Sequence, residues 1–225
     1  MEISGLIKNS FVDYPKNIAC VVFTAGCNMN CWYCHNHDLI SETKGEIDEE
    51  YVFSLLEERK KFLDGVVITG GEPTLQPDLT EFIKKVKAIG LKVKLDTNGT
   101  NLSVVKNLVN AGFLDYIAMD VKAPLSKYSV ITSVPNIQEI KDSIEYIKNC
   151  GVDYEFRTTF APNLTSDDIK QLVKDIGFVK NYALQQYRKP EHIVKEILKP
   201  HLPSELNALK EELGGLVNNF IIRNI

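Results

Sequence analysis

The alternation of short strand-like runs with amphipathic stretches constrains the fold of this chain most strongly. Runs rich in Val, Ile, Thr, Tyr and Phe are each followed by a stretch with helical spacing of apolar residues. Strand-then-helix units in succession favour parallel strands joined by right-handed crossovers. The predicted strands cover residues 18–24, 65–69, 92–96, 116–121, 154–160 and 182–186, with a possible further strand at 220–223. The predicted helices cover residues 48–61, 78–89, 103–110, 136–149, 166–176 and 204–213.

Six such units are too few for a closed eight-stranded barrel. We therefore expect an α/β fold in the form of an open, partial (β/α)6 barrel, with a doubly wound sheet as the alternative. The chain has 225 residues, of which 44% are hydrophobic, and this is enough for one well-buried core but short for two. We expect a single domain over residues 1–225, with a core at about 18–187 and a helical C-terminal extension at 188–225.

The charge balance and the apolar runs exclude several classes of protein. The net charge of −4, without a dense run of Lys and Arg, does not provide the basic face that nucleic acid requires. No run of about 18 apolar residues could span a membrane, and the first residues lack the regions of a signal peptide. We expect a cytoplasmic protein whose partners are small molecules or other proteins, with no nucleic acid and no membrane.

Three of the five cysteines lie close together in the sequence. Cys27, Cys31 and Cys34 follow the first predicted strand with three and two intervening residues. Thiolates this close repel one another unless a metal centre takes up their charge, and iron–sulfur clusters are usually held by four cysteines. No fourth cysteine is near, so a four-iron cluster here would keep one iron open for chemistry. Cys20, in an apolar run, and Cys150, before a glycine, are predicted to be packing residues.

A structural zinc site is the alternative for the same cysteines. Cys27, Cys31 and Cys34 with either His35 or His37 would make the Cys3His set that suits zinc. Such a protein would be a non-catalytic binding protein stabilised by zinc.

The position of the polar residues along the chain favours a catalytic site. In parallel α/β folds, ligands bind beyond the carboxyl ends of the strands, and these ends meet at one rim. A detached zinc site does not predict that polar motifs gather at this rim. The motifs at the successive strand ends are Thr24-Ala-Gly-Cys27, Thr69-Gly-Gly-Glu-Pro73, Asp96-Thr-Asn-Gly99, Met119-Asp-Val-Lys122, Arg157 and Leu184-Gln-Gln-Tyr187.

The cysteine triad, with the aromatic Tyr33 before its last member, resembles the radical S-adenosylmethionine (SAM) superfamily. Gly70-Gly71-Glu72-Pro73 at the end of the second strand resembles the GGEP motif of the same superfamily. The resemblance implies a 4Fe–4S cluster on the three cysteines, with SAM on the open iron and the GGEP loop at the SAM amino group. It also implies that one electron cleaves SAM to methionine and a 5′-deoxyadenosyl radical.

The third and fourth strand ends carry oxygen ligands. The order of Asp96, Thr97 and Asp120 is similar to that in the activases of glycyl radical enzymes. In those activases, the equivalent positions bind a monovalent cation that also contacts the SAM carboxylate. The resemblance therefore implies such a cation at Asp96, Thr97 and Asp120 in this chain. Asn98 and Lys122, beside these residues, are further candidates for cofactor binding. The alternative is ordinary turn chemistry, with Asp96 capping a turn and Asp120 paired with Lys122.

Other candidate site residues also follow from the resemblance to activases. Arg157 matches the arginine that meets the SAM carboxylate, a bidentate task that suits guanidinium, and a surface salt bridge is the alternative. Tyr187 stands where activases commonly place a histidine that contacts the ribose. Phe23, Trp32 and Tyr33 are candidates for covering the adenine, and each could equally be a core residue.

Two segments are similar to a narrower family. Ser10-Phe-Val-Asp-Tyr-Pro15 and Cys20-Val-Val-Phe-Thr-Ala-Gly-Cys27 resemble the anaerobic ribonucleoside-triphosphate reductase activating proteins, whereas Cys34-His35-Asn36 is similar to the activases of glycyl radical enzymes in general. Pyruvate formate-lyase activases tend to carry Asp-Gly-Pro-Gly where this chain has Asp13-Tyr-Pro-Lys16. Lys16-Asn17 and His37 depart from the usual pattern of the reductase activators.

The resemblance implies a glycyl radical enzyme as the partner, with anaerobic ribonucleoside-triphosphate reductase as the expected one. A flavodoxin or ferredoxin would supply the electron. Three alternatives stay open: the activase of another glycyl radical enzyme such as pyruvate formate-lyase, a small-molecule radical SAM enzyme such as a 7-carboxy-7-deazaguanine synthase, and the zinc-binding protein.

Overall fold

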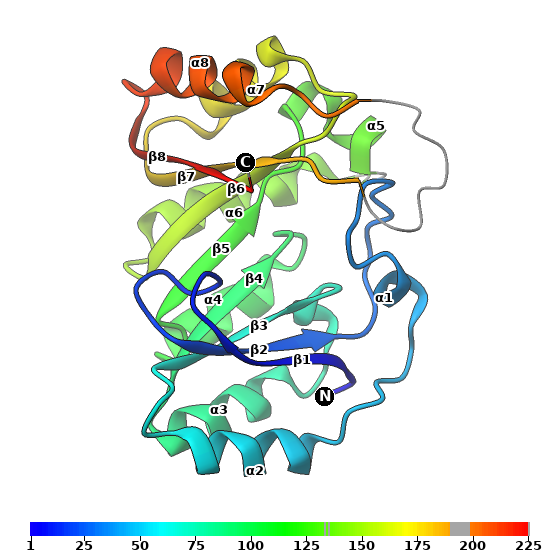
Figure 1. Cartoon of the computed structure of the whole chain (residues 1–225), viewed down its shortest axis with the longest axis vertical. Coiled ribbons are helices and arrows are strands. Elements are labelled where there is room, and N and C mark those ends of the chain that lie inside the picture. Colours follow the sequence, from blue (N-terminus) through cyan, green and yellow to red (C-terminus); the bar gives the residue numbers. More distant parts are fainter. Residues whose placement is uncertain (133, 135, 190–198, 225) are drawn as a thin grey trace.

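A single open sheet of eight strands organises the protein (Figure 1). The computed structural model describes residues 1–132, 134, 136–189 and 199–224. The strands follow one another across the sheet in chain order, and only β1 runs antiparallel to its neighbour. They are β1 Ile3–Ser10, β2 Ala19–Thr24, β3 Gly65–Gly70, β4 Lys92–Thr97, β5 Tyr116–Asp120, β6 Asp153–Phe160, β7 Val179–Gln186 and β8 Val217–Arg223.

The predicted helices are all confirmed, and capping residues mark some of their ends. Asp48 caps α2 by accepting from the Glu50 amide at 2.9 Å, and Gly90 ends α3 in the left-handed region. The helices are α1 Asp38–Ser41, α2 Glu49–Arg59, α3 Leu79–Ile89, α4 Leu102–Asn110, α5 Tyr128–Thr132, α6 Ile137–Asn149, α7 Ser166–Ile176 and α8 Pro203–Leu213. Two 3-10 turns, η1 Pro73–Leu75 and η2 Leu125–Lys127, follow β3 and β5.

The six predicted strands are β2 to β7, and the sheet extends beyond them at both edges. β1, which pairs with β2, was not predicted from the sequence. The possible strand at 220–223 is confirmed and begins earlier, because β8 pairs with β7 from Val217 onward. The C-terminal extension was predicted to be helical. Its described part contains the helix α8 and also the edge strand β8. The first part of β8 lacks a strand-like apolar pattern, because it contains the polar residues Asn218 and Asn219, which are exposed at the sheet edge.

The two faces of the sheet differ in character. The outer face and the helices that cover it form one large apolar core, which contains residues such as Leu56, Phe82 and Phe156. The inner face has only a small apolar cluster near the amino ends of the strands, formed by Tyr14, Ala19, Val21, Val67, Tyr116 and Ala118.

The connection between β1 and β2 closes part of the inner face. It crosses in front of the sheet in Figure 1 and carries Tyr14, whose ring centroid lies 5.9 Å from that of Tyr116. Tyr14 is 3% exposed, so it helps to fill the space on the inner face of the sheet at the amino ends of the strands. Polar residues are left to line the carboxyl end.

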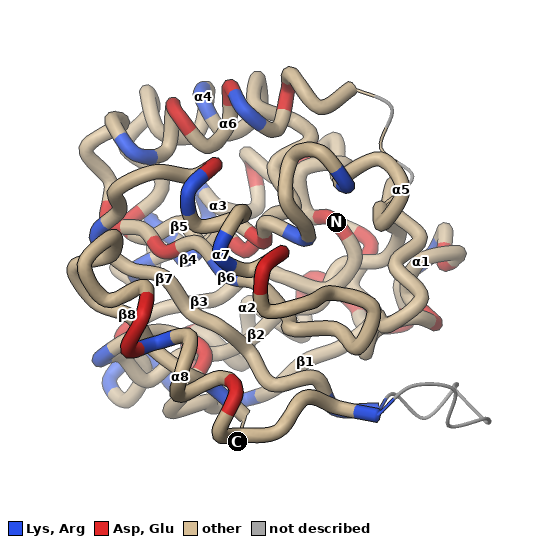
Figure 2. Tube along the Cα trace, turned by 90° about the horizontal axis from the view of Figure 1, so that it is seen from above, with Lys and Arg blue, Asp and Glu red and all other residues tan. Residues whose placement is uncertain are grey.

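The described outer helices include no membrane-spanning element, and they carry charges of both signs. No helix among the described residues is both long and apolar enough to cross a bilayer. Lys and Arg alternate with Asp and Glu along the outer helices in Figure 2.

The β8 edge contributes a buried ion pair that gives a stability prediction. Arg223 holds Glu155 with two bonds of 2.8 and 2.7 Å, and the Glu155 side chain is 1% exposed. Breaking a buried pair by removing one partner costs about 3–5 kcal/mol. We expect Arg223→Met to lower the free energy of unfolding by about 3 kcal/mol, near the lower limit because Arg223 is 25% exposed. Denaturant unfolding of the reduced, metal-free protein measures this.

The exposed pair of Lys180 and Asp153, 3.2 Å apart, is the matched control. Lys180→Met should cost less than about 1 kcal/mol. Equal losses in the two variants would show that the β8 pair is not a buried anchor.

Candidate functional site

A cavity of about 370 Å³ opens at the carboxyl ends of the strands. Most of the predicted site residues line it, and they come from strands β2 to β6 and from the loops that follow β2 to β5. These residues are Phe23, Cys27, Cys31, Tyr33, Cys34, Gly70, Gly71, Glu72, Asp96, Thr97, Asn98, Asp120, Lys122 and Arg157. The convergence predicted from the strand ends is therefore present in the structure.

The three clustered cysteines lie on the loop between β2 and α1 and are free thiols. Cys31 is buried, and Cys27 and Cys34 are half-buried. Burial raises the pKa of all three thiols, and the positive charge of Lys122 acts in the opposite direction. Metal binding requires thiolates, so a soft metal centre would displace protons from this wall of the cavity.

The donor set fits an iron–sulfur cluster better than a zinc ion. Among the described residues, no three His, Cys, Asp or Glu side chains converge on a point that could hold one metal ion. In a four-iron cluster each cysteine binds a different iron, whereas zinc gathers its ligands on one ion. His35 lines the cavity but is exposed, and His37 directly precedes α1. The Cys3His site considered from the sequence is thus not formed in this structure.

The paired glycines at the end of β3 bring two loops together. Gly70 has a φ of 112°, and a Cβ on Gly71 would lie 1.9 Å from the carbonyl oxygen of Gly26. The Gly71 amide donates to the Thr24 carbonyl at 2.9 Å, and the Glu72 amide donates to the Gly26 carbonyl at 2.8 Å. The absence of side chains therefore lets the β3 loop pack against the backbone that leads into the cysteine loop.

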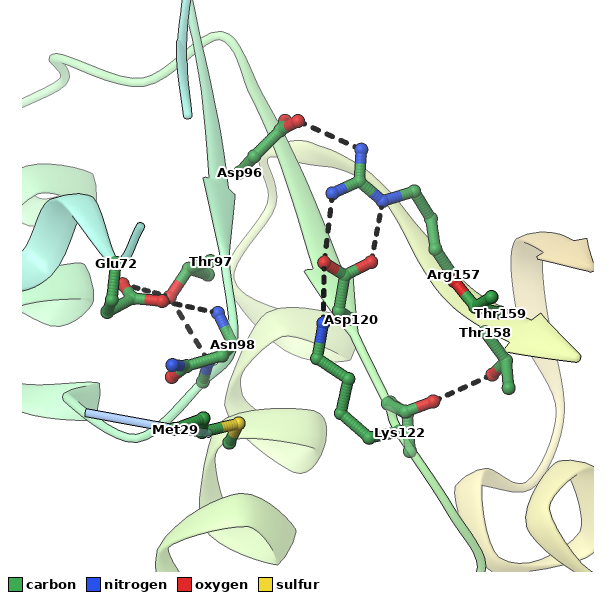
Figure 3. A network of polar contacts seen from close by, with 12 residues as sticks. Met29, Glu72, Asp96, Thr97, Asn98, Asp120, Lys122, Arg157, Thr158 and Thr159 are labelled. Atoms are coloured by element: carbon green, nitrogen blue, oxygen red, sulfur yellow. Dashed lines mark hydrogen bonds and ion pairs between the residues drawn. The ribbon is translucent and has the colours of Figure 1, made fainter. Parts of the chain in front are cut away.

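Glu72 is an internal brace. Its fully buried carboxylate accepts from the Thr74 amide and hydroxyl at 3.1 and 2.5 Å, from the Thr97 hydroxyl at 2.8 Å and from the Asn98 amide at 2.6 Å (Figure 3). Burial raises its pKa, and these donors oppose the rise. The carboxylate joins the loops after β3 and β4, so the GGEP loop can meet a ligand through its backbone rather than through this side chain.

Side-chain amides tie the cysteine loop to its neighbours. Asn98 donates to the Asn28 side chain at 2.9 Å, and Asn28 donates to the Thr100 hydroxyl at 2.7 Å. Asn36, two residues after the last clustered cysteine, donates to the Gly70 carbonyl at 3.4 Å. The loop is therefore attached to the β4 loop between Cys27 and Cys31, and to the end of β3 after Cys34.

The opposite wall of the cavity carries a network of charged side chains (Figure 3). Arg157 donates from Nε and Nη2 to the two oxygens of Asp120, at 2.9 and 3.2 Å, and from Nη1 to Asp96 at 2.9 Å. Lys122 donates to Asp120 at 3.2 Å. On the other side, the ammonium of Lys94 contacts the second oxygen of Asp96.

Charge pairing outweighs burial at both aspartates. Burial alone would raise their pKa values, but Arg157, with Lys94 beside Asp96 and Lys122 beside Asp120, holds them below the ordinary value. Burial likewise lowers the pKa of Arg157 and of Lys122, and the attraction of Asp120 reverses the shift at each. Asp96 and Asp120 are therefore carboxylates, and Arg157 and Lys122 are cations, at neutral pH.

The predicted cation site does not fit the observed contacts. The pairing of Asp120 with Lys122, which was the alternative, is confirmed. Both oxygens of Asp96 already accept from basic side chains, and the Thr97 hydroxyl donates to Glu72. The oxygens expected to bind a monovalent cation are thus used by the protein itself.

Arg157 and Lys122 leave the wall suited to an anionic group. The three bonds of Arg157 use three of its five N–H donors, and both residues line the cavity. A ligand carboxylate can therefore meet guanidinium and ammonium groups at this wall.

The aromatic candidates divide into two groups. Phe23 and Tyr33 line the cavity, so their predicted role over an adenine stays a prediction. Tyr187 is not among the lining residues, and its ring lies 5.9 Å from that of Trp32. The predicted contact of Tyr187 with a ribose has no support in this geometry. Pro73 begins η1 and is buried behind the cavity wall.

Several residues that shape the site were not predicted. Asp13, Met29 and Thr159 line the cavity, and Lys94 contacts Asp96 from the same strand. One signal could have found Lys94, because charged residues alternate with apolar ones in β4, which reads Lys-Val-Lys-Leu-Asp-Thr. A parallel strand covered on both faces is normally apolar throughout, so this alternation indicates a polar inner face.

Comparison with known proteins places the site in a family. The sequence model of the Radical SAM superfamily matches residues 21–176. A protein of Methanocaldococcus jannaschii, named as a candidate glycyl-radical enzyme activating enzyme, is 37% identical over 99% of this chain and 96% of its own length. The pyruvate formate-lyase-activating enzyme of Clostridium pasteurianum is 30% identical over 80% of this chain and 78% of its own length.

Solved structures share the fold. SuiB of Streptococcus suis, in a crystal structure with S-adenosylmethionine bound, superposes with a TM-score of 0.69 at 15% identity. The match covers 88% of this chain and 48% of SuiB, so this chain corresponds to about half of that protein.

The brace formed by Glu72 gives a prediction for the site. In Glu72→Gln, one acceptor oxygen becomes an N–H donor, which then faces either the Asn98 amide or the three donors on the other oxygen. Leaving buried donors unsatisfied costs about 1–3 kcal/mol. We expect that loss in the free energy of unfolding, together with weaker SAM binding in equilibrium dialysis.

Glu81→Gln on the exposed face of α3 is the matched control and should change neither quantity. If Glu72→Gln were as stable as the parent protein and bound SAM equally well, Glu72 would not be a brace.

Proposed function

Because the chain belongs to the radical SAM superfamily, we propose that it is an activase that places a glycyl radical on a partner enzyme. The main support is one observation: three free cysteines and a basic wall of Arg157 and Lys122 line the same cavity. The relative from Methanocaldococcus jannaschii, whose name describes this activity, matches almost the whole chain.

Cys27, Cys31 and Cys34 are the residues that would hold a 4Fe–4S cluster. When bound, this group supplies one electron to the sulfonium of SAM, giving methionine and a 5′-deoxyadenosyl radical that takes a hydrogen atom from a glycine Cα. An external flavodoxin or ferredoxin is the proposed electron donor.

The protein's own residues would orient SAM and exclude water. Arg157 and Lys122 would bind its carboxylate, and the backbone of Gly70 and Gly71 lies where the amino group is expected. Tyr14 and the apolar cluster around it close the amino end of the half-barrel, so access is from the rim at the carboxyl ends. Such shielding protects a reactive radical from side reactions.

The proposed partner is anaerobic ribonucleoside-triphosphate reductase. Support comes from the segments Ser10–Pro15 and Cys20–Cys27, which resemble the activating proteins of that reductase. The similarity to a pyruvate formate-lyase-activating enzyme makes pyruvate formate-lyase the second candidate. Free cysteines persist in reducing compartments, which supports a cytoplasmic location.

Electron paramagnetic resonance of the partner enzyme tests the proposal. Reconstituted protein, SAM and a reductant are mixed without oxygen with either the reductase or pyruvate formate-lyase. We expect a glycyl radical doublet on the reductase. A doublet only on pyruvate formate-lyase would overturn the partner, and SAM cleavage without a radical on either protein would favour a small-molecule radical SAM enzyme.

Two cysteine variants control the same experiment. Cys31→Ala should lose the cluster absorption, SAM cleavage and the radical, because it removes a ligand. Cys150→Ser should keep all three, since Cys150 follows α6 and is not among the residues that line the cavity. Cleavage retained by Cys31→Ala would contradict the assignment of the ligands.

A further inference from the structure

We propose that Lys94 supplies, as an ammonium attached to the chain, the positive charge that a monovalent cation was predicted to bring to Asp96. Lys94 is then a positioning residue for SAM binding, acting through Asp96 and Arg157. The inference rests on the SAM site of the proposed function, but it does not depend on the identity of the partner enzyme.

The register of β4 places Lys94 beneath the cavity. Lys94 lies two residues before Asp96, so both side chains project from the inner face of the sheet. The Lys94 side chain is 1% exposed, although lysine is rarely buried so deeply. Its ammonium contacts one oxygen of Asp96, while Arg157 donates to the other at 2.9 Å. Asp96 is thus held between two cations of the protein.

The oxygens that could bind an added ion are committed elsewhere. Asp120 accepts two bonds from Arg157 and one from Lys122. The Thr97 hydroxyl donates to Glu72 and accepts from the Gly99 amide at 3.1 Å. An ion at this position would have to displace at least one of these partners.

The charge count also disfavours an added ion. The wall already holds three basic side chains, Lys94, Lys122 and Arg157, against the two carboxylates of Asp96 and Asp120. Burial, together with the charge of Arg157, lowers the pKa of Lys94, and the contact with Asp96 opposes this shift and favours the ammonium form. The other carboxylate that acts on Lys94 is Glu155 on β6, which Arg223 neutralises. A further cation would therefore enter a buried site with excess positive charge, where repulsion is strong because the dielectric constant is low.

Removing the Lys94 ammonium should open a place for a free ion. In Lys94→Ala, one oxygen of Asp96 would lose its partner. The missing lysine side chain would leave an empty space next to that oxygen. A monovalent cation could then restore the charge that Lys94 provides. The native protein should bind SAM equally well with or without such ions, whereas the variant should require them.

The experiment measures SAM affinity of the cluster-containing protein by equilibrium dialysis, in KCl and in choline chloride at equal ionic strength. We expect the native dissociation constant to differ by less than about twofold between the two salts. For Lys94→Ala, we expect binding about tenfold weaker in choline chloride and largely restored in KCl, since tenfold corresponds to the loss of one modest charged contact. Lys92→Ala, on the same strand but exposed, should behave like the native protein.

Direct binding of Tl⁺, a probe for K⁺, gives a second readout that does not need SAM or a partner. The native protein should not perturb the ²⁰⁵Tl resonance, whereas Lys94→Ala should shift or broaden it in a way that K⁺ reverses. If Lys94→Ala does not fold, Lys94→Met retains most of the side-chain volume and replaces it in both assays.

Several results would overturn the inference. One is a native protein whose SAM affinity falls when K⁺ is replaced by choline. Another is a Tl⁺ site in the native protein. The third is a Lys94 variant that binds SAM as tightly as the native protein in both salts. A failure to form a glycyl radical on the partner would overturn the proposed function and leave these measurements unaffected.

Discussion

The ion pairs between Arg157 and the carboxylates of Asp96 and Asp120 are the interaction on which the site depends. Parallel sheets are normally covered by apolar residues on both faces, so charges on the inner face must compensate one another. Arg157 on β6 bonds to Asp120 on β5 and to Asp96 on β4, and this joins three strands at their carboxyl ends. The basic wall that faces the cysteines is fixed in this way.

The same principle of internal compensation holds the loops above the sheet. Glu72 uses its carboxylate on four donors from the β3 and β4 loops, and the Gly70–Gly71 backbone packs against the end of β2. The Glu72 carboxylate therefore positions the two loops and is not available to a ligand. The cysteine thiols, Arg157 and Lys122 remain directed at the cavity.

The fold could be predicted from the sequence as far as its apolar periodicity extends. The six strands β2 to β7 and the six long helices have clear patterns, and all were identified. β1 and β8 lie at the sheet edges, where half-exposed strands carry mixed residues, and this weakened their signals. The cysteine triad and the GGEP loop were found because their chemistry depends on spacing along the chain.

Contacts across strands could not be predicted in the same way. Lys94 and Glu155 are charged residues that a sequence pattern assigns to the surface, yet both are buried. Glu155 on β6 pairs with Arg223 on β8, and Lys94 contacts Asp96, which Arg157 of β6 also holds. The cation predicted at Asp96 does not fit these contacts, because Lys94 on the same strand and Arg157 on β6 already occupy both oxygens of Asp96. The contact between Tyr187 and Trp32 was likewise not predicted, because Trp32 comes from a loop that is distant in the sequence.

The central claim is that Cys27, Cys31 and Cys34 hold a four-iron cluster with one iron left for SAM. Mössbauer spectroscopy of the ⁵⁷Fe-reconstituted protein, before and after SAM is added, tests it most directly. The account predicts that one iron in four changes its isomer shift when SAM binds, while the other three keep theirs. A spectrum in which SAM leaves every iron unchanged, or a preparation with no four-iron cluster, would contradict it.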